Sequence, residues 1–345
     1  MRTKQAFPRT AGAPVESLRV AANSKSWQLN LPTAVTVWAS IVLAAAFSGV
    51  WLGFAGRPFA LALGVAAVLF AFELFLAAPR VLDTAKSWLG PRGAVLAPLV
   101  PLFAVLIYSF GVSGDWRRML AGAAYTVVPA LLLSGRTGQP PGTWEDYAAV
   151  ALVWLPVEFR WMYGLFPYPR PLTHTLAILA ALTTGVAAFV LLRRLDGIGY
   201  AVEWRPGFAW NFAFGFFVLA AIAIPLGMKI GFLVWGPTLA RLRLLPVSAV
   251  GILFFTAWPE EFLFRGLLQN LLSHTLKNQW AGLIIASTIF GLSHILHAPY
   301  PNWKYVGLAT IAGLFYGHAW MKTGSLLPGA LIHALVDLSW HLLFR

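Results

Sequence analysis

Apolar runs of about 20 residues recur along the chain, separated by short polar segments rich in Gly and Pro, and each is long enough to cross a bilayer as a helix. The pattern predicts ten or eleven transmembrane helices, because the run at 118–134 is short and residues 228–240 could form a re-entrant segment. The expected spans are 34–54, 58–78, 94–110, 118–134, 147–166, 172–192, 207–227, 246–272, 280–297, 305–321 and 325–343.

Composition agrees with an all-α, polytopic membrane helix bundle. Of the 345 residues, 59% are hydrophobic and only 11% are charged, whereas an ordinary soluble domain has about 25% charged residues. The net charge of +13 comes from basic residues scattered near the ends of apolar runs, which is typical of membrane anchoring and not of a nucleic-acid interface. There is no cysteine, which excludes disulfides, thiolate metal sites and a thiol nucleophile.

Polar residues divide the chain into three regions. Residues 1–30 predict a disordered basic tail, whose five Lys and Arg favour a cytoplasmic N-terminus. Residues 31–204 predict a membrane region without a recognisable motif. Residues 205–345 hold most of the candidate chemistry: Glu260, Glu261 and Asp337 are the only acidic residues after position 204, and six of the seven histidines lie within 274–341.

The stretch PEEFLFRG (259–266) places three charged side chains in an apolar run. Residues four apart share a helix face, so Glu261 and Arg265 are expected to pair. Glu260 points about 100° away, which leaves one carboxylate free. Ionisable groups inside a membrane are candidate functional residues because their burial is costly.

Two later helices bring histidines. His294 ends the run STIFGLSH, whereas His297, beside the loop HAPYP, is better explained as a boundary residue. His333 and Asp337 are four apart on one predicted helix face, and a carboxylate beside an imidazole orients the ring and supports its charge.

A buried glutamate with two histidines suits two chemistries. One is activation of water by a carboxylate base with help from histidine. The other is binding of a divalent metal such as zinc, with Glu260, His294, His333 and Asp337 as candidate ligands. The paired i, i+4 histidines that usually anchor zinc on a helix are absent, so we favour the metal-free alternative.

Three motifs on successive helices carry a family resemblance: EExxxR at 260–265, FxxxH from Phe290 to His294, and HxxxD from His333 to Asp337. Together they resemble the CPBP family, which contains the type II CAAX prenyl endopeptidases and the bacteriocin-processing or immunity "Abi" proteins. The last motif position, often Asn in that family, is Asp337 here. The resemblance covers residues 205–345.

The resemblance implies an intramembrane endopeptidase with its catalytic core in the last four helices. Glu260 would activate water with His294 alongside, His333 and Asp337 would face the oxyanion, and Glu261 and Arg265 would support the first helix. Substrates would be membrane-embedded or membrane-adjacent peptides, including CAAX-like ones. An ionised Asp337 cannot donate a hydrogen bond as Asn can, so it must be protonated, orient His333 or bind a metal.

Two alternatives compete with the enzyme: a non-catalytic immunity or peptide- or lipid-binding protein of the same fold, and a transporter with a proton relay. The ionisable residues converge in one half rather than following a path through both, which favours the enzyme. In the first half, Glu158 and Arg160 are interpreted as a structural pair or a degenerate echo of the motif, and Glu73 has no assigned role. The composition, rich in Ala, Leu, Gly, Pro and Arg, suggests a protein of a bacterial cell membrane.

Overall fold

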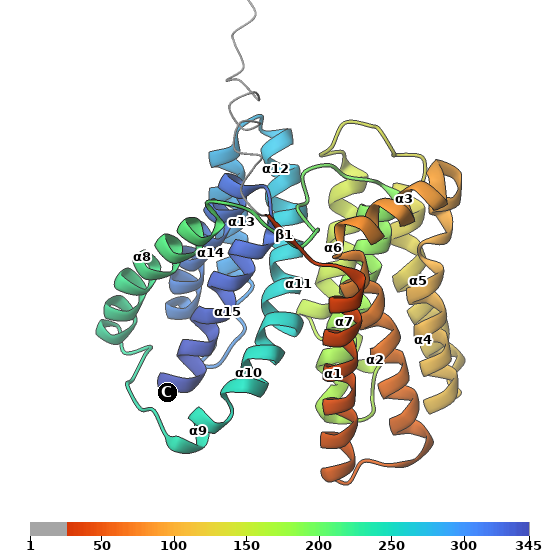
Figure 1. Ribbon diagram of the computed structural model, residues 1–345, viewed down its shortest axis with the longest axis horizontal. Coiled ribbons are helices and arrows are strands. Elements are labelled where there is room, and N and C mark those ends of the chain that lie inside the picture. The colour runs from red at the N-terminus through yellow and green to blue at the C-terminus, as the bar shows by residue number, and fades with distance from the viewer. Residues whose placement is uncertain (1–25, 345) are drawn as a thin grey trace, which may run out of the picture.

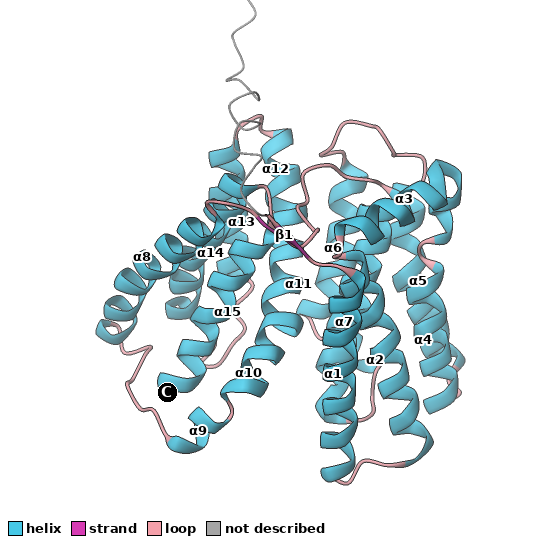
Figure 2. Cartoon of the chain, viewed as in Figure 1, coloured by secondary structure: helices cyan, strands magenta, loops and turns pink. Residues whose placement is uncertain are grey.

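The computed structural model describes residues 26–344 and is 77% helical, as expected for an all-α membrane bundle. Figure 2 shows how little of the described chain is strand. The helices of the first half are α1 (Leu31–Trp51), α2 (Gly56–Leu76), α3 (Pro79–Gly93), α4 (Leu99–Val112), α5 (Trp116–Leu133), α6 (Trp144–Glu158) and α7 (Thr173–Gly185), which continues as the π-helix Val186–Leu192.

The second half begins with α8 (Phe208–Lys229) and α9 (Leu239–Arg243). A run of 31 residues, Leu245–Thr275, follows. It consists of α10 (Leu245–Ile252), the π-helix Leu253–Ala257, α11 (Trp258–Glu261), the π-helix Phe262–Gln269 and α12 (Asn270–Thr275). The last helices are α13 (Gln279–Leu292), α14 (Trp303–Thr323) and α15 (Leu326–Leu343).

Short elements complete the chain. Three are single 3₁₀ turns, at Ala94–Leu96, Trp161–Gly164 and Arg170–Leu172. Strands β1 (Trp27–Gln28) and β2 (Glu203–Trp204) pair antiparallel, with Trp27 opposite Trp204. Of the basic tail predicted for residues 1–30, residues 1–25 lie outside the described part of the chain. The remainder contains strand β1.

The predicted number of membrane spans is too high. Six described helical segments are long and apolar enough to cross a membrane: α1, α2, α7 with its π-helical extension, α8, Leu245–Thr275 and α15. A seventh results if α3 with its 3₁₀ extension and α4, bent by 52°, form one broken span. The other expected spans are helices, but α6 and α13 have only 15 and 14 residues, and α5 and α14 carry charged side chains.

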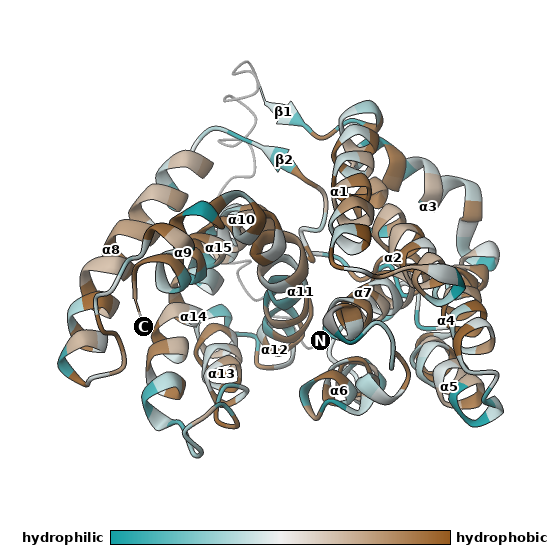
Figure 3. Cartoon of the chain, turned by 90° about the horizontal axis from the view of Figure 1, so that it is seen from below, coloured by the Kyte–Doolittle hydropathy of each residue, from teal (hydrophilic) through white to brown (hydrophobic). Residues whose placement is uncertain are grey.

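The helices form two groups that lie side by side (Figure 1). Helices α1–α7 make one group and α8–α15 the other, with α7 and α11 at their junction. The view from below in Figure 3 shows the same division, with brown apolar stretches on most helices. Residues 193–207 connect the groups, and the expected division between residues 204 and 205 lies on this connection.

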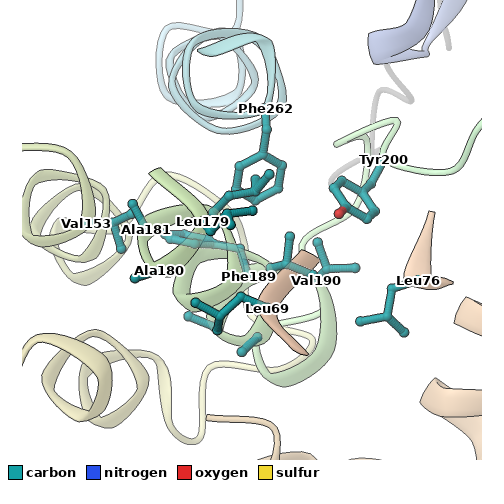
Figure 4. Close-up of a cluster of buried hydrophobic side chains, with 14 of the residues drawn as sticks. Leu69, Leu76, Val153, Leu179, Ala180, Ala181, Phe189, Val190, Tyr200 and Phe262 are labelled. Carbon is teal, nitrogen blue, oxygen red and sulfur yellow. The ribbon is translucent and has the colours of Figure 1, made fainter. Parts of the chain in front are cut away.

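The two groups share an apolar core. Phe262, which follows Glu261 directly, is 2% exposed and packs edge-on against Tyr200, with ring centroids 5.6 Å apart. Figure 4 shows its ring pointing towards Leu179 and Ala181 of α7. A Cβ at Gly185 would lie 2.8 Å from the Phe262 ring, so the glycine allows α7 to approach it closely. This packing fixes the EExxxR helix against the first half.

Side-chain caps begin the last three helices. Asn278 accepts from the backbone N–H groups of Trp280 and Ala281, at 2.9 and 3.1 Å, at the start of α13. Asn302 and Ser325 begin α14 and α15 in the same way. These caps satisfy otherwise unpaired N–H groups and set the first residue of each helix.

Replacing Phe262 by Ala should destabilise the protein strongly, by about 3–5 kcal/mol, because it leaves a cavity between the two groups of helices. Thermal unfolding of purified protein in detergent measures the change. Phe217→Ala on α8, where the side chain is 68% exposed, is the matched control. Equal unfolding temperatures for the two variants would contradict the proposed packing role.

Candidate active site

The structure brings the sequence-predicted site residues together from three helical segments. Glu260 and Glu261 end α11, His294 lies just after α13, and His333 and Asp337 are on α15. Four of the five line one cavity of about 710 Å³ between the two groups of helices: Glu260, His294, His333 and Asp337. Glu261 lies behind them, fully buried.

The pair expected from the i, i+4 spacing is present. Arg265 Nε donates to Glu261 Oε2 at 3.1 Å, and both side chains are completely buried. This pair persists although Phe262–Gln269 is π-helical. Short π-helical segments occur frequently at functional sites.

Aromatic rings surround the rest of the Arg265 guanidinium. Its two terminal nitrogens have no hydrogen-bond partner among the described residues, and Cζ lies 4.9 Å from the ring centroid of Phe290, 5.8 Å from Tyr316 and 6.0 Å from Phe264. Ring faces attract a cation at such distances. The aromatic cage therefore replaces the missing acceptors.

Glu261 also binds His333, which the spacing alone did not predict. Oε1 of Glu261 accepts from His333 Nδ1 at 3.1 Å. An ionised carboxylate only accepts, so Nδ1 carries a proton. The partner that fixes the tautomer of His333 is thus Glu261, and not Asp337 as the HxxxD spacing suggested.

Two carboxylates face the other nitrogen of the same ring. Glu260 Oε2 lies 3.7 Å from His333 Nε2, and Asp337 Oδ2 lies 3.6 Å from it. Both distances exceed a normal hydrogen bond. The Glu260 side chain is 31% exposed, yet its Oε2 atom is buried and has no hydrogen-bond partner among the described residues. The two carboxylates therefore lie close to Nε2 without a direct hydrogen bond to it.

Aromatic contacts hold the His333 ring in place. Tyr316 stacks on it with centroids 4.6 Å apart and an interplanar angle of 14°. Phe290 meets it edge-on at 5.6 Å. A ring fixed on both sides, with Nδ1 bound, keeps Nε2 aimed at Glu260 and Asp337.

The FxxxH spacing has a direct structural meaning. The Phe290 carbonyl accepts from His294 Nδ1 at 2.8 Å, one helical turn earlier. This leaves His294 Nε2 without that proton and able to accept. Tyr305 packs against the ring at 4.4 Å and His297 stacks on it at 5.6 Å. His297, expected to be a boundary residue, also lines the cavity.

One glycine permits α15 to approach the glutamate pair. A Cβ at Gly329 would lie 3.0 Å from Glu261 Oε2 and 3.1 Å from the Tyr316 carbonyl oxygen. Contacts this short require the neighbours to move. Gly329 therefore sets the distance over which Glu261 and His333 meet.

The four candidate metal ligands line one cavity. Within residues 26–344, no group of three or more His, Cys, Asp or Glu side chains could hold a metal ion. His333 Nδ1 is bound by Glu261, and His294 Nδ1 by a backbone carbonyl. Both bonds leave Nε2 free, which is also how a metal-binding histidine uses its two nitrogens.

Sequence reasoning missed several residues around the site. Tyr316 and Tyr305 come from α14, which carries no recognised motif, and Gln269 Nε2 donates to the Gly317 carbonyl at 3.2 Å. The spacing of Gln269, four after Arg265, could have placed the two side chains on one helix face, but not against Gly317. Another correction concerns Glu158 and Arg160: they form no ion pair among the described residues, and both line the cavity. Glu73, left without a role, accepts from Thr183 Oγ1 at 2.7 Å.

Arg265→Ala should lower stability by about 3–5 kcal/mol, because it leaves the Glu261 carboxylate buried without its cation. Membrane yield and thermal unfolding in detergent measure the loss. Glu260→Gln serves as the control, because Glu260 has no ion pair with Lys or Arg among the described residues and should unfold near the wild-type temperature. Wild-type stability of Arg265→Ala would show that the pair is not structural.

Gly329→Ala should destabilise the protein by about 1–3 kcal/mol through overpacking against Glu261. Gly307→Ala, in the open part of α14, has nothing within 4 Å of the added Cβ. There we expect a neutral or slightly stabilising effect, because Ala favours helix over Gly. Thermal unfolding compares the two variants, and indistinguishable results would argue against a tight α15 contact.

Comparison with known proteins bears on residues 242–339, which match the family model described as Type II CAAX prenyl endopeptidase Rce1-like. No curated protein and no solved structure matches the chain. The matched range contains all three motifs, from Glu260 to Asp337, and leaves out the first half. At the family level the match supports a CAAX-type intramembrane protease acting on membrane-embedded peptides. Residues 242–339 are thus similar to the Rce1-like family, which is consistent with the CPBP resemblance of the three motifs.

Proposed function

We propose that this protein is an intramembrane endopeptidase in which Glu260 activates the water that attacks the peptide bond. The observation that carries the proposal is the convergence of Glu260 Oε2 and Asp337 Oδ2 on His333 Nε2, at the wall of a cavity. Glu261 holds the opposite side of that ring. A base, an oriented imidazole and room for substrate are the parts that hydrolysis requires.

Glu260 is suited to act as the base because its Oε2 atom has no other hydrogen-bond partner among the described residues. A water in the cavity would donate one proton to the Glu260 carboxylate and attack the carbonyl carbon of the peptide. Glu260 would then be protonated and could return the proton to the leaving amine. A positioned base of this kind contributes about 10²–10⁴-fold to the rate.

His333 is suited to stabilise the oxyanion. With one proton held at Nδ1 by Glu261, a second proton on Nε2 makes the ring an imidazolium, which the carboxylates of Glu261 and Asp337 both favour. Nε2–H then donates to the developing oxyanion. An ionised Asp337 supports this charge and needs no donor function of its own, which resolves the difficulty of finding Asp where Asn is usual.

His294 would assist from the same cavity. Because its Nδ1 proton binds the Phe290 carbonyl, Nε2 can accept a hydrogen bond from the attacking water or from the leaving amine. The mechanism that we propose is metal-free, and none of its steps passes through a metal ion.

The surroundings suit a peptide with apolar side chains. A second cavity of about 110 Å³ reaches His333 and Asp337 from the other side, and apolar residues of α8 and α14 line most of it, including Leu219, Ala220, Ala309 and Ala312. An apolar side chain next to the cleaved bond could occupy it. Membrane-embedded segments and CAAX-like tails belong to this class of substrate.

Glu260→Gln is nearly isosteric but cannot take up a proton, so kcat should fall by about 10²–10⁴-fold while expression and unfolding stay near wild type. Cleavage of a peptide library by purified protein measures the effect. Turnover at the wild-type rate would remove Glu260 from the mechanism. No cleavage even by the wild-type protein, with peptide binding retained, would favour the non-catalytic alternative.

Asp337→Asn separates the metal-free mechanism from a metal-dependent one. We expect the variant to keep most of its activity, because Glu261 still supports the charge of the His333 ring and the introduced Asn could donate to the oxyanion directly. We also expect chelators to leave wild-type turnover unchanged. A metal-dependent mechanism would instead show stoichiometric zinc in the active protein, and chelation would remove the zinc and the activity together. In that case Asp337→Asn would also weaken zinc binding.

A further inference from the structure

The first half of the chain supplies one wall of the active-site cavity. Glu158, Arg160, Tyr163 and His174 line the same cavity as Glu260 and His294. None of these four lies in the range that matches the family model, residues 242–339. The wall they form is therefore specific to the part of the chain that no comparison explains.

Local structure fixes where Arg160 lies. Helix α6 ends at Glu158, shortly after Pro156, and Arg160 adopts a left-handed conformation with φ 59° before the turn Trp161–Gly164. Such a φ is uncommon for a residue with a Cβ, and it is found more often where a backbone position serves a function. Tyr163, whose hydroxyl lies 2.9 Å from His174 Nδ1, ties this turn to α7.

The Arg160 guanidinium has no side-chain partner within residues 26–344. Among the described residues it forms neither an ion pair nor a side-chain hydrogen bond, and the side chain is exposed. The other cavity-side charge of this segment is engaged, because Trp154 Nε1 donates to Glu158 Oε2 at 3.2 Å. By contrast, Arg193 and Arg265, which are buried, each bind a carboxylate.

We propose that Arg160 binds a carboxylate of the peptide substrate and so orients the peptide in the cavity. The inference rests on the proposed function. A guanidinium presents a planar set of donors that matches a carboxylate in a bidentate contact. Glu260 and Asp337 on the facing wall repel the same group. The substrate carboxylate is thereby held at the Arg160 wall, which leaves the bond to be cleaved near Glu260.

The carboxylate could belong to the C-terminus of the peptide or to an acidic side chain, and three versions of one Ala- and Leu-rich peptide library distinguish them. The first ends in a free carboxylate, the second in a carboxamide, and the third in a carboxamide with one internal Ala replaced by Asp. We expect wild-type protein to prefer one carboxylate-bearing version over the plain carboxamide by about 10- to 100-fold in kcat/KM, the range of a charged hydrogen bond.

Arg160→Gln should remove this preference in kcat/KM. The variant should cleave only the preferred version more slowly, mainly because KM for that version rises. Arg160→Lys should restore part of the preference, because the charge remains without the planar donors. Arg80→Gln is the matched control, since Arg80 is exposed on α3 and lines none of the cavity. Its preference should equal that of wild type.

Equal cleavage of all three versions by wild-type protein would overturn the inference. So would an equal loss for every version in Arg160→Gln, the result expected if Arg160 serves the fold or binds a lipid phosphate. Binding of the fluorescent libraries to Glu260→Gln protein gives a readout independent of hydrolysis. If Glu260→Gln protein binds a carboxylate-bearing version more tightly, and adding Arg160→Gln abolishes that preference, the inference is supported even if the proposed hydrolysis fails. If Glu260→Gln protein shows no such preference in binding, the inference is contradicted.

Discussion

The arrangement of the site depends on the Glu261 carboxylate, which binds both Arg265 and His333. One oxygen binds Arg265 and the other binds His333, so a single buried anion joins the first and last motif helices. Burial of a charge is costly unless it is paired and hydrogen-bonded. Here the cation is itself enclosed by the rings of Phe290, Tyr316 and Phe264. The ring of His333 is therefore set by an internal network, while Glu260 remains free for other work.

The first half contributes through packing and through the cavity wall. Phe262 follows Glu260 and Glu261 directly and packs against α7, where Gly185 makes room for its ring. The same half brings Arg160 and His174 to the cavity. The Rce1-like range holds the candidate chemistry, and the helices before it complete the space in which a peptide would lie.

Much of this arrangement could be predicted from the sequence, because it depends on spacing within one helix. The i, i+4 rule indicates the Glu261–Arg265 pair, and the order of apolar runs predicts the order of the helices. The contact between Glu261 and His333 joins residues 72 positions apart, and no local pattern encodes it. The span count was too high because runs such as that in α13 are apolar but short. The role of Tyr316 could not be predicted, because an aromatic residue in an apolar helix gives no sign of its stacking partner His333.

Double-mutant cycles on the free energy of unfolding test most directly whether Glu261 joins the two helices. The variants are Glu261→Gln, Arg265→Met and His333→Gln, alone and in pairs with Glu261→Gln, unfolded in the same detergent. Residues in one buried network couple by about 0.5–3 kcal/mol, whereas independent residues add. We expect coupling of that size between Glu261 and each of its two partners. Additive effects in the Glu261–His333 cycle would contradict the central role of this carboxylate.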